Sequence, residues 1–169
     1  MSKKNILILP GDEVGPEITT EVIKILDFFN ESKMTNISYE FGDIGGASLD
    51  KYNKPITDET LERARKSDAV LLASVGTPKY DNNVRELKPE HGLLVLRKYL
   101  NLFINIRPIF VFNTLLDYSS IKSDLINDLD IVIIRELIGD VYFGEPRGFK
   151  DVNGDRVGYN TMLYSESEV

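Results

Sequence analysis

The stretch that decides the fold runs from Ile6 to Glu17 and reads ILILPGDEVGPE. Its first four residues are all apolar, which is typical of a strand buried on both faces of a sheet. The sequence Pro10-Gly11-Asp12 predicts a turn, and Pro16 stands where a first helical residue is favoured. The stretch therefore indicates a strand, a tight turn and a helix in direct succession.

The same alternation continues through the first half of the chain. Apolar residues recur at helical spacing from Ile18 to Phe29, and residues 37–41 are β-prone. Residues 57–66 predict a helix capped by Thr57, with acids early and bases late. Ala69–Val75 is a second, almost wholly apolar run that predicts a buried strand. This order predicts an α/β fold, a mostly parallel sheet flanked by helices.

The chain becomes less regular after residue 75. Residues 76–89 form a polar loop, and loops of this length are usually functional. The elements expected beyond it are a helix over 90–100, β-prone runs at 103–107 and 109–112 around Pro108, some helix within 115–129, a buried strand at 130–135, and a glycine-rich, turn-rich segment at 139–158. Because the α/β rhythm weakens after this point, we expect a domain change near residue 102, which divides the chain into residues 1–101 and 102–169.

Composition narrows the classes of function. The 169 residues carry a net charge of −7, which disfavours nucleic acid as a partner. The chain has no cysteine and a single histidine, His91, so thiolate chemistry and sites with several histidine ligands are excluded. No apolar run approaches the roughly 20 residues of a membrane span. We therefore expect a cytoplasmic protein that does not bind membranes.

Two groups of side chains are candidates for binding a small acid. Glu90, Leu93, Leu94 and Arg97 share one face of the expected helix, which suits a ligand with a branched alkyl group and a carboxylate. That face could equally be a core-facing stripe with charges at its edges.

The second group consists of residues at or beyond expected strand ends. Arg107 and Arg135 close two such strands, and arginine binds carboxylates through two parallel hydrogen bonds. Tyr142 follows in the glycine-rich segment, where a tyrosine near a cation can donate a proton. The alternative interpretation is surface ion pairs and a packed aromatic ring.

Five segments together identify a family resemblance. They are Leu9–Glu17, Ser74–Asp81 (SVGTPKYD), Arg97–Pro108 (RKYLNLFINIRP), Arg135–Gly148 and Tyr159–Ser165. In this order the chain resembles the β-decarboxylating dehydrogenases, which include the isopropylmalate, isocitrate, homoisocitrate and tartrate enzymes. The likeness covers essentially the whole chain. The leucines at 93 and 94 resemble the isopropylmalate branch, in which they hold the substrate's isopropyl group.

The resemblance implies NAD-dependent oxidative decarboxylation of 3-isopropylmalate, a step of leucine biosynthesis, by a homodimer. It also implies an incomplete two-domain subunit, in which residues 1–101 are the N-terminal part of the cofactor-side domain and residues 102–169 begin the substrate and dimerisation domain. It implies that Arg97, Arg107 and Arg135 bind the malate carboxylates and that Tyr142 protonates the enolate. It places one continuous segment along the NAD site, namely Thr77, Pro78, Lys79, Tyr80, Asp81, Asn82, Asn83, Val84, Arg85, Glu86, Leu87, Lys88, Pro89 and Glu90.

Some family features are absent or altered in these residues. The resemblance implies Mg²⁺ or Mn²⁺ as a second cofactor, but its aspartate ligands and general-base lysine are expected beyond residue 169. Glu13 and Thr77 stand where the family has glycine, and His91 where threonine or glutamine is more usual. Three interpretations stay open: part of a true enzyme that is inactive alone, an enzyme for another 2-hydroxy acid, or a non-catalytic, truncated binding module.

Overall fold

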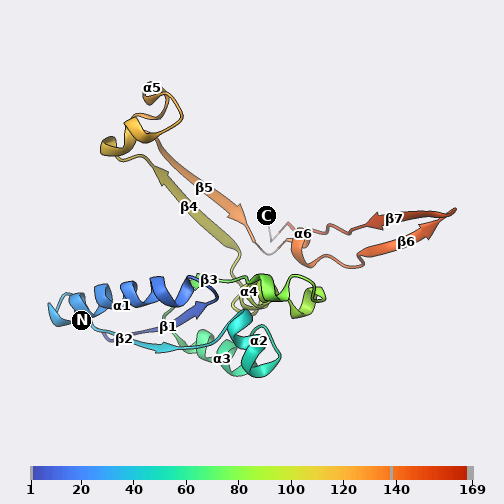
Figure 1. Cartoon of the computed structure of the whole chain (residues 1–169), viewed down its shortest axis with the longest axis horizontal. Helices are drawn as coiled ribbons and strands as arrows, with labels where there is room; N and C mark the ends of the chain where they lie inside the picture. The colour runs from blue at the N-terminus through green and yellow to red at the C-terminus, as the bar shows by residue number, and fades with distance from the viewer. Residues whose placement is uncertain (1, 138, 167–169) are drawn as a thin grey trace. The chain divides into compact units, whose positions relative to one another are not determined.

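The computed structural model describes residues 2–137 and 139–166. The chain divides into two compact units, Met1–Leu100 and Asn101–Val169 (Figure 1). The first unit contains, in chain order, β1 (Lys4–Gly11), α1 (Gly15–Glu31), β2 (Ile37–Phe41), α2 (Gly46–Tyr52), α3 (Asp58–Lys66), β3 (Ala69–Ser74), the 3₁₀ helices η1 (Pro78–Tyr80) and η2 (Arg85–Leu87), and α4 (Pro89–Tyr99).

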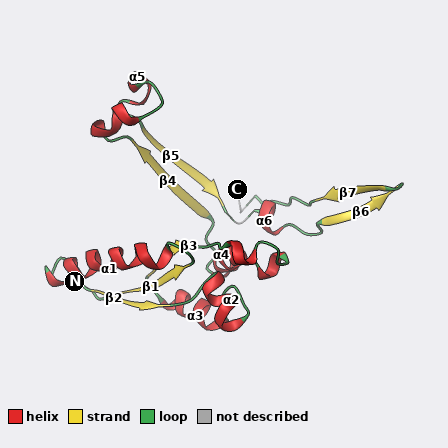
Figure 2. Ribbon diagram, viewed as in Figure 1, coloured by secondary structure: helices red, strands yellow, loops and turns green. Residues whose placement is uncertain are grey.

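The first unit is built on a parallel sheet with the strand order β2-β1-β3. Helix α1 lies along one side of this sheet and α3 lies on the other (Figure 2). The α/β fold with a parallel sheet is therefore confirmed. Helix α2 was not expected, because seven residues that begin with glycine carry no clear helical periodicity.

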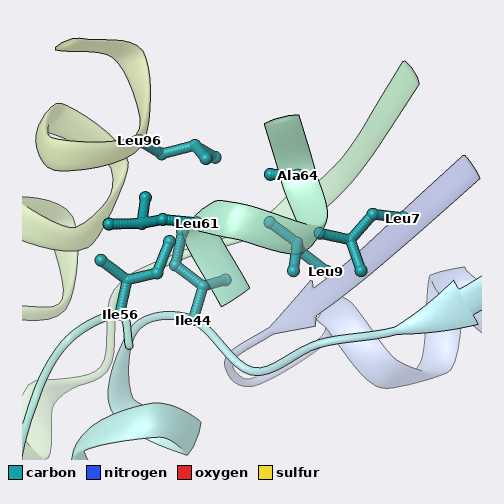
Figure 3. Packing of buried hydrophobic residues seen from close by; sticks show 7 residues of the cluster. All are labelled: Leu7, Leu9, Ile44, Ile56, Leu61, Ala64 and Leu96. Carbon is teal, nitrogen blue, oxygen red and sulfur yellow. The ribbon is translucent and has the colours of Figure 1, made fainter. Parts of the chain in front are cut away.

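The core lies between the sheet and the helices on the α3 side. Alternate residues of β1 point to opposite faces, so Leu7 and Leu9 face the same way. They join Ile44, Ile56, Leu61, Ala64 and Leu96 in one buried cluster (Figure 3). The expectation of full burial holds for the centre of β1, but the side chains of β3 are only partly buried. The physical reason is position, since β3 is an edge strand and β1 has a neighbour on each side.

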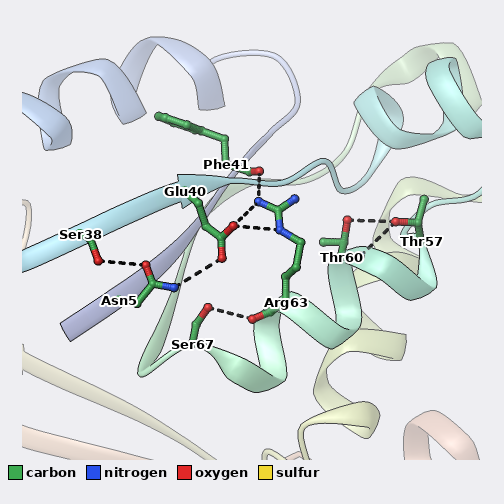
Figure 4. A network of polar contacts seen from close by, with 8 residues as sticks. All are labelled: Asn5, Ser38, Glu40, Phe41, Thr57, Thr60, Arg63 and Ser67. Carbon is green, nitrogen blue, oxygen red and sulfur yellow. Dashed lines mark hydrogen bonds and ion pairs between the residues drawn. The ribbon is translucent and has the colours of Figure 1, made fainter. Parts of the chain in front are cut away.

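Polar contacts fix α3 against the sheet (Figure 4). The Arg63 guanidinium donates to Glu40 Oε2 from two nitrogens, at 2.8 and 3.0 Å, and to the Phe41 carbonyl at 2.6 Å. At the other end of the helix, Thr57 Oγ1 accepts a hydrogen bond from the Thr60 amide at 3.2 Å, which confirms the predicted cap.

The two strand ladders described in the second unit are both antiparallel. Its elements are β4 (Ile104–Phe110), η3 (Asn113–Tyr118), α5 (Ser123–Ile126), β5 (Asp130–Glu136), α6 (Asp140–Phe143), β6 (Gly148–Val152) and β7 (Asp155–Tyr159). Strand β4 pairs with β5 along its whole length, and β6 pairs with β7.

Three expectations for this unit were wrong. Pro108 does not divide two strands but lies within β4, because a two-stranded ladder has an unpaired side where a missing N–H breaks no bond. Strand β5 is exposed at every residue, since apolar content alone does not say what packs against a strand. The glycine-rich segment contains the β6–β7 hairpin, whose Asn153-Gly154 turn has φ of 54° and 91° and carries a recognisable hairpin signal.

Candidate functional site

The carboxyl edge of the parallel sheet is organised by Asp12. This side chain is only 5% exposed, and its carboxylate accepts three backbone hydrogen bonds. Oδ2 accepts from the amides of Gly46 and Gly76, and Oδ1 accepts from Ala47, all at 2.9 Å. Asp12 therefore joins the turn after β1, the start of α2 and the segment after β3, and uses its charge to satisfy backbone donors.

A pocket of about 320 Å³ opens at this edge. Its walls come from the turn after β1, from α2 and from the segment after β3. They are formed by Gly11, Asp12, Glu13, Gly46, Ala47, Asp50, Thr77 and Lys79. Parallel α/β sheets bind ligands beyond the carboxyl ends of their strands, and this pocket lies in that position. Two of the residues predicted to line the NAD site, Thr77 and Lys79, thus border this pocket.

Gly76, the residue just before the segment predicted to bind the cofactor, approaches Glu90 closely. A Cβ added to Gly76, whose φ is 130°, would lie 3.0 Å from Glu90 Oε1. Glu90, at the other end of the predicted segment, is thereby brought next to its start. Between them, the residues of η1 and η2 are mostly exposed.

Glu13 and Thr77, which stand where the family has glycine, differ in backbone strain. Thr77 is extended, with φ of −148° and ψ of 137°, so a side chain is accommodated without backbone strain. Glu13 has φ of 52°, in the left-handed region that favours glycine.

The residues of helix α4 that pack on the core differ from those predicted to bind substrate. Pro89, Gly92 and Leu96 are buried, and a Cβ on Gly92 would lie 2.6 Å from the Pro55 carbonyl oxygen. The side chains of Leu93, Leu94 and Arg97 are partly exposed, and Glu90 is exposed. The interpretation of these residues as the core-facing stripe is therefore wrong, because the stripe that packs on the core is one position away.

His91 follows Glu90 on the same helix. Its Nδ1 atom is buried and has no hydrogen-bond partner among the described residues. Burial lowers the pKa of the imidazole below its ordinary value, and the nearby positive charge of Arg85 lowers it further.

The second unit brings together three residues predicted to act on substrate. Arg107 and Arg135 lie on one face of the β4–β5 ladder, together with Asn105. Asn105 is paired with Arg135 across the two strands, and Arg107 lies two residues further along β4. Arg107 Nε donates to Asn105 Oδ1 at 2.6 Å. The Arg135 guanidinium donates to the Tyr142 hydroxyl and lies 5.6 Å from its ring centroid.

The predicted substrate residues are divided between the two units. Arg97, Leu93 and Leu94 belong to the first unit, whereas Arg107, Arg135 and Tyr142 belong to the second. Convergence of the three guanidinium groups in one cleft therefore stays a prediction.

Asn105 and Asp50 were not anticipated from the sequence. Asn105 could have been found from its position two residues before Arg107 in an alternating strand. Asp50 could not, because its contacts are with residues about 30 positions away.

Two features are absent from residues 2–137 and 139–166. No group of three or more histidine, aspartate or glutamate side chains in these ranges is placed to hold a metal ion. None of the helices within the described ranges is both long and apolar enough to cross a membrane.

The first unit has the architecture of α/β proteins that bind ligands at the carboxyl edge of a parallel sheet. Within that class, the chain belongs to the isocitrate/isopropylmalate dehydrogenase family, whose model matches residues 5–169.

Named relatives agree with this assignment. A Pseudomonas putida protein named 3-isopropylmalate dehydrogenase is 51% identical over 167 residues, covering 98% of this chain and 46% of that protein. The chain spans about half the length of the curated relatives it matches.

Solved structures show the same fold. A β-decarboxylating dehydrogenase from Thermococcus kodakarensis matches with a TM-score of 0.63 at 29% identity, covering 98% of this chain and 42% of that one. Isocitrate dehydrogenase from Methylococcus capsulatus matches with a TM-score of 0.73 at 22% identity, over 98% and 44% of the two chains, a likeness of fold alone.

Proposed function

We propose that this chain supplies the substrate-binding and much of the cofactor-binding surface of an NAD-dependent 3-isopropylmalate dehydrogenase of leucine biosynthesis. The observation that carries the proposal is the group of Arg107, Arg135 and Tyr142 in the second unit. Both arginines lie on one face of the β4–β5 ladder, and Arg135 donates a hydrogen bond to the Tyr142 hydroxyl. The name shared by relatives about 50% identical to this chain supports the substrate.

The arginines serve to bind and orient the diacid. A guanidinium group holds a carboxylate through two parallel hydrogen bonds and keeps its charge in a cleft. Leu93 and Leu94 offer partly exposed apolar surface for the isopropyl group. Because burying a third carboxylate against two leucines would leave it poorly solvated, this pair favours isopropylmalate over isocitrate.

Two features of the first unit support the proposed cofactor site. Gly11 and Gly76 both have positive φ, and Thr77 and Lys79 border the pocket at the sheet edge. These residues fit NAD, which supplies the acceptor for the hydride that leaves the alcohol carbon. Glu90, beside Gly76, is positioned to contact the nicotinamide end in this proposal.

Tyr142 is the proposed proton donor. Loss of carbon dioxide from the β-keto acid leaves an enolate, and the Tyr142 hydroxyl gives its proton to the enolate carbon. Arg135, which donates to the same hydroxyl oxygen, stabilises the negative charge that remains there. We propose Mg²⁺ or Mn²⁺ for the whole enzyme, but the described residues offer no metal site and we assign them no step through the metal.

We also propose a homodimer in the cytoplasm. The face of the β4–β5 ladder opposite Arg107 carries Ile104, Ile106, Phe110, Val132 and Ile134. Ile106 and Ile134 are paired across the strands and are 64% and 70% exposed. Contiguous apolar surface of this kind marks a protein interface, and a second copy of the chain is the proposed partner.

A chimera tests the proposed function. Residues 1–169 are joined to the part of the Pseudomonas putida relative that lies beyond the matched region. NADH formation is then measured with 3-isopropylmalate, isocitrate, NAD and Mg²⁺. We expect turnover of 3-isopropylmalate in the usual enzymatic range, roughly 1 s⁻¹ or above. No turnover, or a preference for isocitrate, would contradict the proposal.

Two substitutions in the chimera test the residues that carry it. Arg107→Lys should lower kcat/KM by about 10- to 100-fold although the charge is kept, because the paired hydrogen bonds are lost. Arg156→Lys is the matched control, since Arg156 lies over the Phe149 ring in the β6–β7 hairpin. Equal kinetics in the two variants would remove Arg107 from the site.

A further inference from the structure

Helix α2 lies against the segment 76–80, and the contact begins at the buried Asp12. The Asp12 carboxylate accepts from Gly46 and Ala47 at the start of α2 and from Gly76 at the start of the segment, each at 2.9 Å. One side chain therefore holds the first residue of the segment at a fixed place relative to the helix.

The middle of the segment packs directly on the helix backbone. A Cβ added to Gly46 would lie only 2.6 Å from the Thr77 Cγ2 atom. The glycine at position 46 thus leaves the space that the Thr77 methyl group occupies. Thr77, which stands where the family has glycine, thus packs its side chain against the start of α2.

The far end of the segment is held by Asp50, one turn further along α2. Its Oδ1 atom accepts from both Lys79 Nζ and the Tyr80 hydroxyl. Lys79 Nζ also lies 5.2 Å from the centroid of the Tyr80 ring. The hydrogen bond from Lys79, followed by that from Tyr80, lowers the pKa of Asp50 below its ordinary range, so the carboxylate is charged at neutral pH.

We propose that Asp50 is a positioning residue that holds the segment 76–80 on α2 in the conformation that receives the cofactor. The inference rests on the proposed function, because that function is what makes this segment the edge of the NAD site. Asp50 acts through Lys79 and Tyr80. Holding a binding segment in place before the ligand arrives lowers the entropy that binding must overcome.

Asp43 provides a matched control. It accepts from Lys51 Nζ at 2.7 Å and from the Tyr52 hydroxyl at 3.4 Å, so it makes a similar pair of lysine and tyrosine contacts, here with the last two residues of α2. Within the described residues, the hydrogen bonds and the ion pair of Asp43 do not involve residues 76–80. Asp43→Asn therefore removes an equivalent charge and leaves the segment held.

The first experiment uses the 169-residue chain without ligand. Amide hydrogen exchange over residues 77–83 is compared in the unsubstituted chain, Asp50→Asn, Asp50→Glu and Asp43→Asn. We expect exchange to be about tenfold faster in Asp50→Asn, partly restored in Asp50→Glu and unchanged in Asp43→Asn, with β1 and β3 unaffected in all four. Unchanged exchange in Asp50→Asn, or equal acceleration in Asp43→Asn, would overturn the inference.

The second experiment uses the chimera and separates positioning from stability. Asp50→Asn should raise KM for NAD by about tenfold with kcat within twofold, whereas Asp43→Asn should leave both unchanged at a similar melting temperature. An unchanged KM for NAD in Asp50→Asn would overturn the role. If the unsubstituted chimera has no NAD-dependent activity, the proposed function fails, while the exchange experiment still decides whether Asp50 holds the segment.

Discussion

At the scale of single residues, Glu13 occupies a backbone conformation that suits glycine. Its φ is 52°, and an L-residue in this region costs roughly 1–2 kcal/mol. Glycine removes that cost but loses more entropy on folding, by roughly 0.5–1 kcal/mol. We expect Glu13→Gly to raise the free energy of unfolding by about 0.5–1 kcal/mol in urea titrations. Glu13→Ala, which removes the carboxylate but keeps the Cβ, is the control, and an equal gain in both variants would assign the effect to charge.

His91 gives a second prediction at this scale. Because it is the chain's single histidine, its NMR titration can be assigned without ambiguity. Burial lowers its pKa in the folded state, so the unfolded chain takes up the proton at higher pH. Folding stability should therefore fall as pH drops through the ordinary histidine value of about 6.5 and recover above it. We expect a titration midpoint below that value, and His91→Gln should remove this part of the pH dependence. A midpoint at or above about 6.5 would contradict the assignment.

At the scale of elements, α3 depends on its first residue. Thr57 Oγ1 accepts the Thr60 amide, and Thr60 and Leu61 are buried in the turn that follows. Thr57→Ala should lower the free energy of unfolding by about 1 kcal/mol, because an amide at the helix start loses its acceptor. Thr57→Ser keeps the hydroxyl and should cost only a few tenths, about 0.3 kcal/mol. Chemical denaturation of both variants checks this, and equal losses would mean that the threonine methyl group matters rather than the cap.

At the scale of the whole molecule, we expect residues 1–169 expressed alone not to oxidise 3-isopropylmalate. Hydride transfer from an alcohol needs a base for the hydroxyl proton, and the family resemblance places that lysine beyond residue 169. Acid–base groups alone contribute about 10²- to 10⁴-fold. NADH formation with Mg²⁺ or Mn²⁺ is compared with that of the chimera. Turnover of roughly 1 s⁻¹ by the chain alone would show that the catalytic groups have been misplaced.

Features that depend on residues close together in the sequence were predictable, whereas contacts between residues far apart in the sequence were not. The strand at Ile6–Leu9, the cap at Thr57 and the helix α4 arise from neighbours a few positions apart, and the sequence pattern predicted all three. The helix was expected over residues 90–100 and is found at Pro89–Tyr99. The spacing of the motifs likewise indicated the family. The sequence pattern placed Leu93 and Leu94 on one face of α4, but it left open whether that face packs on the core. The tertiary structure shows that Gly92 and Leu96 pack on the core instead.

The sequence by itself determined the α/β class, the main elements of the first unit and the family, because periodicity and turn chemistry act locally. Only the tertiary structure decided which partner each polar group meets. Asp12 bonds to Gly76 across 64 positions, and Asp50 bonds to Tyr80 across 30. The exposure of β5 was decided in the same way, by which elements lie against it. Such contacts depend on where folding brings distant segments together, and no short stretch of sequence contains that information.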